Sequence, residues 1–287
     1  MKFYKSVIVM IVVSLISTLN AQTLRVEVDI LEKNMKNYKI VDAREKNEYL
    51  KTHIDSALSF PSSLTYQHKK IDGTIVQSVK MQKIVREHGL NLDDNIVVYD
   101  DGTFFDAARL FWALEVYGFK NVKLLNGGIK QWEQNNLKTT QVIPQIKSSK
   151  YIVSVNNNRI ATKFSTQMAA INENQIILDA RATKAYNGKM SMAKRYGHIP
   201  TAIHFPATSN IDFTKDIVLL KNEKNLRKMY SKLSNKNKII VYCAMGKIAS
   251  LNYFTLRELD YNVANYDASW KEWGNDLNLP IVNPAEI

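Results

Sequence analysis

The chain has 287 residues, of which 45% are hydrophobic and 23% are charged, and its formal net charge is +12. This composition is typical of a globular protein with a sizeable core, and it excludes a disordered or low-complexity chain. Because the lysines are scattered in short runs such as "QHKK" and "MAKR", we expect no nucleic-acid partner, whereas a positive field favours small anionic substrates.

The N-terminus has the pattern of a secretory signal peptide. Lys2 and Lys5 form a basic region, an uncharged apolar run follows, and Ala21 precedes a candidate cleavage site. The run is shorter than the about 20 apolar residues that span a bilayer, although retention as an N-terminal membrane anchor is the alternative. We therefore expect a signal peptide over 1–21, a periplasmic or secreted protein, and no stable membrane association after cleavage.

Short β-branched runs alternate with helical patterns along the rest of the chain. This alternation predicts an α/β fold, with mostly parallel sheets flanked by helices. The carboxyl ends of such strands usually form the binding crevice. The predicted strands are 39–43, 95–100, 175–180 and 238–243, and the predicted helices are 76–90, 105–119, 223–233 and 249–261.

The same pattern of motifs occurs twice along the chain, which indicates a tandem duplication. We expect a first domain over 22–140, a polar linker over 141–158 and a second domain over 159–287. The repeated segments are "IVDAREKNEY" (40–49) and "ILDARATKAY" (177–186), "HIDSALSFP" (53–61) and "HIPTAIHFP" (198–206), "IVVYD" (96–100) and "IIVYC" (239–243), and "NGGIKQW" (126–132) and "DASWKEW" (267–273).

The only cysteine, Cys243, ends a predicted strand, and the turn "AMGKI" leads from it into a helix. An unpaired thiol in an oxidising compartment is a liability unless it is buried or used. In a strand–loop–helix turn, backbone N–H groups and the helix N-terminus can face the sulfur and favour a reactive thiolate. Gly246 permits the tight curvature, and Lys247 adds a positive charge. A buried, inert thiol is the alternative.

Taken together, these motifs resemble the two-domain sulfurtransferases, rhodanese (thiosulfate sulfurtransferase) and 3-mercaptopyruvate sulfurtransferase. The most specific part is "IIVYCAMGKIAS…NYFTLRELDYNVANYDASWKEW", and the resemblance covers nearly the whole chain after 1–21. It implies two rhodanese-like domains, of which the first is catalytically silent because Asp100 stands at the cysteine position. It also implies that Cys243 takes sulfur from thiosulfate or 3-mercaptopyruvate as a persulfide and passes it to cyanide or a thiol.

The resemblance also assigns weaker roles around Cys243. The donor would be bound by the loop and by Arg181, although Arg44 occupies the same place in the silent copy and a structural ion pair is as plausible for both. His53 is a candidate for proton transfer, with a structural role as its alternative. A second family arginine is replaced by Asn187. The loop residues are Ala244, Met245, Gly246, Lys247 and Ile248.

The loop leaves the donor undecided. Ala244 and Met245 carry no charge, which argues against tight sulfonate binding, but Lys247 could serve. Lys189, Lys194 or Arg195 could replace the missing arginine.

Two other functions share part of this sequence pattern. A rhodanese-fold phosphatase needs an arginine where Ile248 and Ala249 stand, so it is disfavoured. An exported sulfur or metalloid carrier with little turnover is the alternative to an enzyme. We expect a monomer without a cofactor, and one cysteine among scattered histidines gives no metal-ligand spacing.

Overall fold

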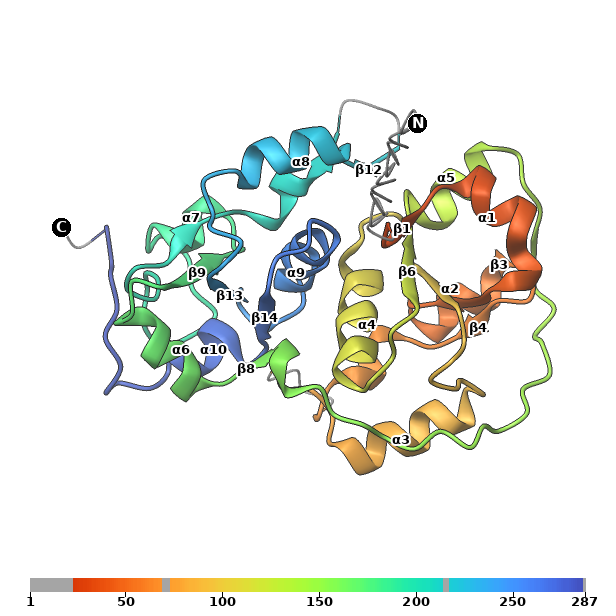
Figure 1. The fold of residues 1–287 in the computed structure, drawn as a ribbon, viewed down its shortest axis with the longest axis horizontal. Coiled ribbons are helices and arrows are strands. Elements are labelled where there is room, and N and C mark those ends of the chain that lie inside the picture. The colour runs from red at the N-terminus through yellow and green to blue at the C-terminus, as the bar shows by residue number, and fades with distance from the viewer. Residues whose placement is uncertain (1–22, 69–72, 214–216, 286–287) are drawn as a thin grey trace, which may run out of the picture.

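The structure is a computed structural model that describes residues 23–68, 73–213 and 217–285. The segment 1–21, where the sequence predicts a signal peptide, lies outside the described residues. Two halves stand side by side, the first coloured red to green and the second green to blue (Figure 1). No helix in the described part of the chain is long and apolar enough to cross a membrane.

The first half contains a five-stranded parallel sheet in the order β1-β6-β5-β2-β4. Its central strands are short β-branched runs buried on both faces, as parallel strands covered by helices usually are. The elements are β1 (Arg25–Val26), α1 (Val28–Asn34), η1 (Met35–Asn37), β2 (Lys39–Asp42), α2 (Lys46–Lys51), β3 (His53–Ile54), β4 (Leu58–Ser59), η2 (Ser62–Thr65), α3 (Ser78–Glu87), β5 (Ile96–Tyr99), α4 (Phe105–Val116), β6 (Val122–Leu125), α5 (Gly128–Gln134) and β7 (Thr139–Thr140).

The second half repeats this topology, with a parallel sheet in the order β10-β9-β13-β14-β8. Read from β8, this order matches that of the first sheet read from β1, so the predicted α/β fold with two like domains is confirmed. The elements are η3 (Asn157–Arg159), β8 (Ile160–Ala161), α6 (Lys163–Ala170), β9 (Gln175–Asp179), α7 (Thr183–Tyr186), β10 (Ile203–His204), η4 (Ala207–Asn210), β11 (Ile211–Asp212), β12 (Leu219–Leu220), α8 (Glu223–Tyr230), β13 (Lys238–Tyr242), α9 (Ala249–Glu258), β14 (Val263–Tyr266) and α10 (Ser269–Trp273).

One continuous apolar core joins the two halves. It runs from the first sheet through α4 and α9 to the second sheet, while the outer face of each sheet has a smaller core of its own. Helices α4 and α9 lie next to each other at the centre of the molecule (Figure 1). There the Phe111 ring meets the Phe254 ring edge-on, with 5.0 Å between centroids. The halves are therefore one packed body rather than two loosely linked domains.

A charged cluster is buried in this interface. Glu115 of α4 accepts hydrogen bonds from the Tyr253 hydroxyl and from Arg257, both on α9, and its carboxylate lies 3.1 Å from the Arg257 guanidinium. At the edge of the interface, Arg25 pairs with Glu258. The first pair joins α4 to α9, and the second joins β1 of the first half to the end of α9.

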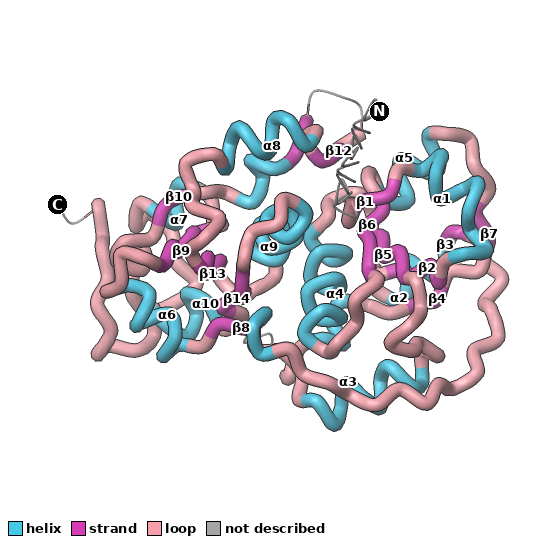
Figure 2. The backbone as a smooth tube through the Cα atoms, viewed as in Figure 1, coloured by secondary structure: helices cyan, strands magenta, loops and turns pink. Residues whose placement is uncertain are grey.

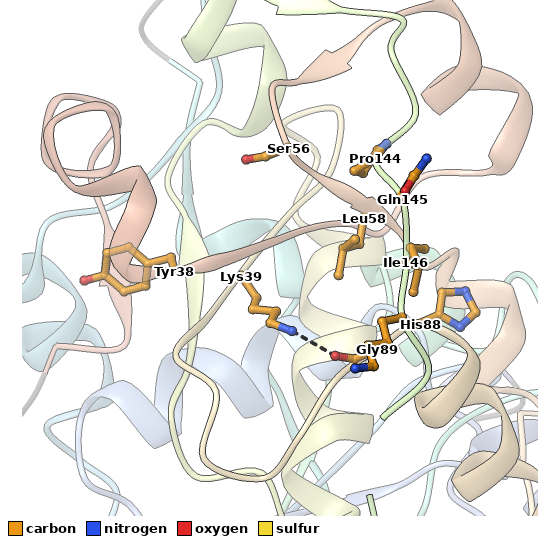
Figure 3. Close-up of a pocket in the computed structure, with 10 residues that line it drawn as sticks. Tyr38, Lys39, Ser56, Leu58, His88, Gly89, Pro144, Gln145 and Ile146 are labelled. Atoms are coloured by element: carbon orange, nitrogen blue, oxygen red, sulfur yellow. Dashed lines mark hydrogen bonds between the residues drawn. The ribbon is translucent and has the colours of Figure 1, made fainter. Parts of the chain in front are cut away.

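The segment between the halves is irregular but packed. It leaves β7 and follows the first half as a long loop (Figure 2). Pro144, Gln145 and Ile146 pass beside His88 and Gly89 and line a hollow with them (Figure 3). Further on, the Tyr151 hydroxyl donates to the Tyr117 carbonyl at 2.7 Å, and the Tyr151 carbonyl accepts from Arg86. The expected linker is thus held against the first half.

We predict that Glu115→Ala lowers the free energy of unfolding by about 2–4 kcal/mol, because it leaves the charge of Arg257 and the Tyr253 hydroxyl without their buried partner. Urea unfolding measures the change. Glu223→Ala is the matched control, since Glu223 pairs with Arg227 on an exposed helix face and should leave the midpoint nearly unchanged. Equal midpoints for wild type and Glu115→Ala would contradict the prediction.

Candidate active site

Cys243 stands at the carboxyl end of β13, the central strand of the second sheet. The parallel strands β9 and β14 flank it, and the loop 243–248 leads directly into α9. The side chain is 1% exposed. Cys243 therefore lies where the sequence predicts it, at the carboxyl edge of the parallel sheet. Its thiol is buried.

The Ser269 hydroxyl fixes the shape of the cysteine loop. It accepts hydrogen bonds from the N–H of Cys243 at 3.1 Å and of Gly246 at 3.0 Å, and it donates to the Tyr266 carbonyl. Its oxygen lies 4.0 Å from the sulfur of Cys243. Gly246 has a φ of +70°, and a Cβ there would lie 2.5 Å from the Asp267 carbonyl oxygen. Glycine is therefore required at 246.

Most N–H groups of this loop are left available. Among the hydrogen bonds within the described part of the chain, none is donated by a backbone N–H of five residues around the sulfur. Unused donors at a strand–helix turn form an anion-binding concavity. These donors belong to Ala244, Met245, Lys247, Ile248 and Ala249.

The first half shows what such a loop binds. Asp100 occupies the position equivalent to Cys243, at the end of β5 and before α4. One of its carboxylate oxygens accepts from the N–H of Gly102 at 2.8 Å and of Phe104 at 3.2 Å. The other accepts from Asp106 at 3.2 Å and from Ala107 at 3.1 Å. A carboxyl side chain thus fills the concavity in the first copy.

Burial and the neighbouring Asp101 raise the pKa of Asp100 to about 7, against the opposing effect of the N–H donors. The carboxylate is therefore held in place by local backbone donors at a cost in desolvation. It is a structural substitute for a bound anion.

A buried arginine of the first half reaches the cysteine loop. Arg109 of α4 is 0% exposed, and its guanidinium donates to the Gly246 and Gly73 carbonyls, each at 3.3 Å. The Ile75 N–H donates to the Asp267 carboxylate at 2.6 Å. A Cβ on Gly73 would lie 2.3 Å from the Asp267 carbonyl oxygen. The first half thus closes directly on the loop.

Lys247 is the charged side chain of the loop, and it pairs with the first half. Its ammonium lies 2.7 Å from the Asp106 carboxylate, which also accepts from the Ser62 hydroxyl. Burial lowers the pKa of Lys247, but Asp106, Tyr66 and Asp100 together outweigh burial, and the resulting pKa is above the usual value. Lys247 is therefore a cation whose charge is partly balanced.

Arg181 is used mainly for structure. It is 3% exposed, forms a bidentate pair with Asp179 and donates to the Gly197 carbonyl at 2.7 Å. Arg44 and Asp42 form the same pair in the first half. Because both copies share the arrangement, it favours the structural alternative for Arg181. One nitrogen of Arg181, Nη1, is buried without a partner among the described residues, which is the atom left for a ligand.

His53 does not lie at the cysteine loop. It is 0% exposed on β3, in the half that does not carry Cys243 (Figure 1). Its ring nitrogens face the carbonyls of Tyr49 at 2.8 Å and Val142 at 3.1 Å, and its ring stacks on Tyr49. His198 stacks on Tyr186 in the same way. The geometry therefore favours a structural role for His53 over proton transfer.

The structure also places Lys189, Lys194 and Arg195, the three candidates to replace the second family arginine. Arg195 donates to the carbonyls of Gly274, Leu279, Trp273 and Asp276, so its guanidinium is occupied by the fold. Lys189 and Lys194 are exposed. In the described part of the chain, no cluster of side chains could hold a metal ion.

Comparison with known proteins identifies the two halves. The sequence profile of the rhodanese-like domain matches residues 27–135 and 163–276, one match in each half. The chain belongs to the rhodanese family.

Relatives of this rhodanese cover most of its length. The Mycobacterium bovis protein named "Putative thiosulfate sulfurtransferase SseA" is 30% identical over 221 residues, 74% of this chain and 73% of that protein. A Haloferax volcanii protein named "Putative thiosulfate sulfurtransferase" is 30% identical over 258 residues, covering 85% and 88%. These names confirm the prediction of a sulfurtransferase enzyme.

Solved structures agree on the fold. SseA from Escherichia coli, described as a 3-mercaptopyruvate sulfotransferase, has a TM-score of 0.77 at 26% identity, covering 86% of this chain and 99% of that one. The anaerobic ergothioneine biosynthesis enzyme from Chlorobium limicola has a TM-score of 0.82 at 16% identity, covering 91% and 70%. At that identity the second structure shows a shared fold only.

One group that contacts the cysteine loop, Arg109, escapes the sequence patterns, because it lies in the first copy, far from Cys243 in the chain. Ser269 lies within the repeated segment "DASWKEW" (267–273), but the repeat alone does not show that its hydroxyl contacts the loop. The signal for Arg109 is "DAARLFW", an arginine in an otherwise apolar helix face, which indicates a buried charge.

We predict that Asp100→Ala leaves sulfur-transfer turnover nearly intact but lowers the free energy of unfolding by about 1–3 kcal/mol, because four N–H groups lose their acceptor. Thermal unfolding and a turnover assay on the same preparation measure both quantities. A hundredfold loss of turnover in a folded variant would show that the loop of the first half takes part in the reaction.

Proposed function

We propose that this rhodanese carries sulfur as a persulfide on Cys243, taking it from a small anionic donor and passing it to cyanide or a thiol. The observation that carries the proposal is the matched pair of loops. Where Asp100 fills its own loop with a carboxyl group, the loop of Cys243 has N–H groups that donate to no acceptor among the described residues. A sulfur that gains a second, negatively charged sulfur would fill the same space.

The proposed reaction has two displacements. The Cys243 thiolate attacks the outer sulfur of thiosulfate, a sulfur–sulfur bond forms, and the donor's own sulfur–sulfur bond breaks with its electron pair leaving on sulfite. With 3-mercaptopyruvate the carbon–sulfur bond breaks instead, and the enolate that leaves takes up a proton to become pyruvate. Cyanide or a thiolate then attacks the outer sulfur, and the electron pair returns to Cys243.

The protein's part in these steps is electrostatic. Backbone N–H groups that are already oriented stabilise the thiolate and the persulfide anion alike, and they need no reorganisation during the reaction. Ser269 keeps the loop in this shape through its contacts with Cys243 and Gly246. Lys247 adds a positive charge that favours an anionic donor.

Two sulfur donors are compatible with the loop. Relatives of this chain are named for thiosulfate, and a solved structure is described for 3-mercaptopyruvate. Both donors are small anions, and Lys247 can offer its charge to either only in competition with Asp106. We therefore propose both as candidate donors and separate them by experiment.

We predict that the protein forms thiocyanate from cyanide with at least one of thiosulfate and 3-mercaptopyruvate, and that Cys243→Ser abolishes turnover, a loss of at least about 1,000-fold. The Cys243 side chain is buried and serine is similar in shape, so the variant should fold. Colorimetric thiocyanate assays with each donor separately name the preferred one. Ser231→Ala is a control that leaves Cys243 in place, since the exposed Ser231 hydroxyl only donates to the Lys228 carbonyl at the end of α8. A folded wild-type protein inactive with both donors would favour a sulfur or metalloid carrier.

We also propose that the protein acts as a monomer after export to the periplasm or outside the cell. The support is the basic and apolar pattern of 1–21. The expected result is an N-terminus at Gln22 and a monomeric native mass for protein isolated from the producing cells. An intact Met1 on soluble cytoplasmic protein would overturn the proposal of export.

A further inference from the structure

Tyr66 carries a buried hydroxyl that the fold does not use. The residue follows η2, pairs with Ile75 in an antiparallel bridge and is 5% exposed. Its hydroxyl oxygen is buried and has no hydrogen-bond partner among the described residues. Buried tyrosine hydroxyls nearly always have a partner, because an unpaired polar group costs free energy. An unpaired one in an active site therefore points to a ligand.

The surroundings of this hydroxyl are those of the cysteine loop. The Arg109 guanidinium lies over the Tyr66 ring, 4.2 Å from its centroid, and the same guanidinium donates to the Gly246 carbonyl. Burial raises the pKa of Tyr66, Arg109 and Lys247 lower it, and Cys243 and Asp106 raise it. Tyr66 thus lies within electrostatic range of the thiol and of Lys247, and it remains a neutral phenol that can donate.

The segment that carries Tyr66 is held firmly. Thr65, the preceding residue, donates to the Ser62 carbonyl at 2.7 Å and accepts from Arg109 at 3.0 Å. Ile75, the bridge partner of Tyr66, is fixed to Asp267 at 2.6 Å. A hydroxyl on such a support has a defined position, as a group that acts on a transition state requires.

We propose that the Tyr66 hydroxyl donates a hydrogen bond to an oxygen of the group that leaves the sulfur donor, sulfite or the enolate of pyruvate. The inference rests on the proposed function and adds to it a donor from the silent half. As the bond to the outer sulfur breaks, its electron pair moves onto the leaving group, whose oxygens become more negative. A hydrogen bond to these oxygens therefore strengthens in the transition state, and Tyr66 keeps its proton.

This role predicts different effects on the two half-reactions. Leaving-group oxygens exist only while the persulfide forms. When cyanide takes the outer sulfur, the leaving group is the Cys243 thiolate, which the loop amides stabilise. Loss of the hydroxyl should therefore slow the first half-reaction and leave the second unchanged.

The test is Tyr66→Phe, with both half-reactions measured in single turnovers. Rapid quenching and intact-mass measurement follow the gain of one sulfur atom from thiosulfate or 3-mercaptopyruvate, and its loss to cyanide. We expect persulfide formation to slow by about 10- to 100-fold. We expect the transfer to cyanide to be unchanged, and the melting temperature to be equal or higher because an unpaired buried hydroxyl is removed.

Tyr49→Phe is the matched control. The Tyr49 hydroxyl is buried in the same half but donates to the Ala57 carbonyl at 2.9 Å. Its loss should lower the melting temperature and leave both half-reactions unchanged, which is the opposite pattern.

Three outcomes would overturn the inference. Unchanged persulfide formation in Tyr66→Phe would show that the hydroxyl does not act on the donor. A lower melting temperature with both half-reactions slowed equally would show a merely structural residue. A wild-type protein that gains no sulfur from either donor would overturn the proposed function and this inference together, and that failure is recognised because it occurs without any substitution.

Discussion

The buried guanidinium of Arg109 is the interaction on which the geometry of the site depends. A charge removed from water is costly unless hydrogen bonds and favourable electrostatics replace its hydration. Here the replacement comes from the Thr65 hydroxyl, from carbonyls of both halves, and from the faces of Tyr66 and Trp112 at 4.2 and 4.5 Å. Gly246 of the cysteine loop supplies one of these carbonyls. The hydrogen bond that replaces part of the hydration of Arg109 therefore also positions the loop.

The anion that faces this charge is also buried. Burial raises the pKa of Asp267 to about 6, while Arg109 opposes the increase and so favours the carboxylate. Asp267 immediately precedes Ala268 and Ser269, and it accepts from the N–H groups of Ala268 and Ile75. The serine that holds the cysteine loop is therefore positioned by a carboxylate that the first half helps to keep ionised.

The sequence predicts the parts of this site that are local in the chain. Period and composition place β13, α9 and the loop between them, and the repeated "DAR" motif forms the Asp42–Arg44 and Asp179–Arg181 pairs. Comparing the two copies also indicates the role of His53, which the motif of one copy does not. A histidine that stacks on a tyrosine in both copies serves the fold, since only one copy has the cysteine.

The sequence does not predict the contacts between residues that are far apart in the chain. Ser269 reaches Cys243 across 26 positions, and Arg109 reaches Gly246 across 137. Neither separation leaves a pattern, because each depends on how two strands or two halves pack. The ends of α3 and α4 likewise differ by a few residues from the predicted ones, since Gly89 and Gly118 adopt positive φ beyond them.

The duplication places two equivalent loops in one packed body, and the two differ in what fills them. Asp100 accepts hydrogen bonds from four N–H groups of its own loop, so in that copy these four donors are already used. At the equivalent place in the second copy stands Cys243, whose shorter side chain carries no carboxylate. The first half contacts this second loop through Arg109, which donates to the Gly246 carbonyl, and through Asp106, which pairs with Lys247. The two loops thus differ in what fills them, whereas the first half contributes to the candidate active site through the surface that it presents to the loop of Cys243.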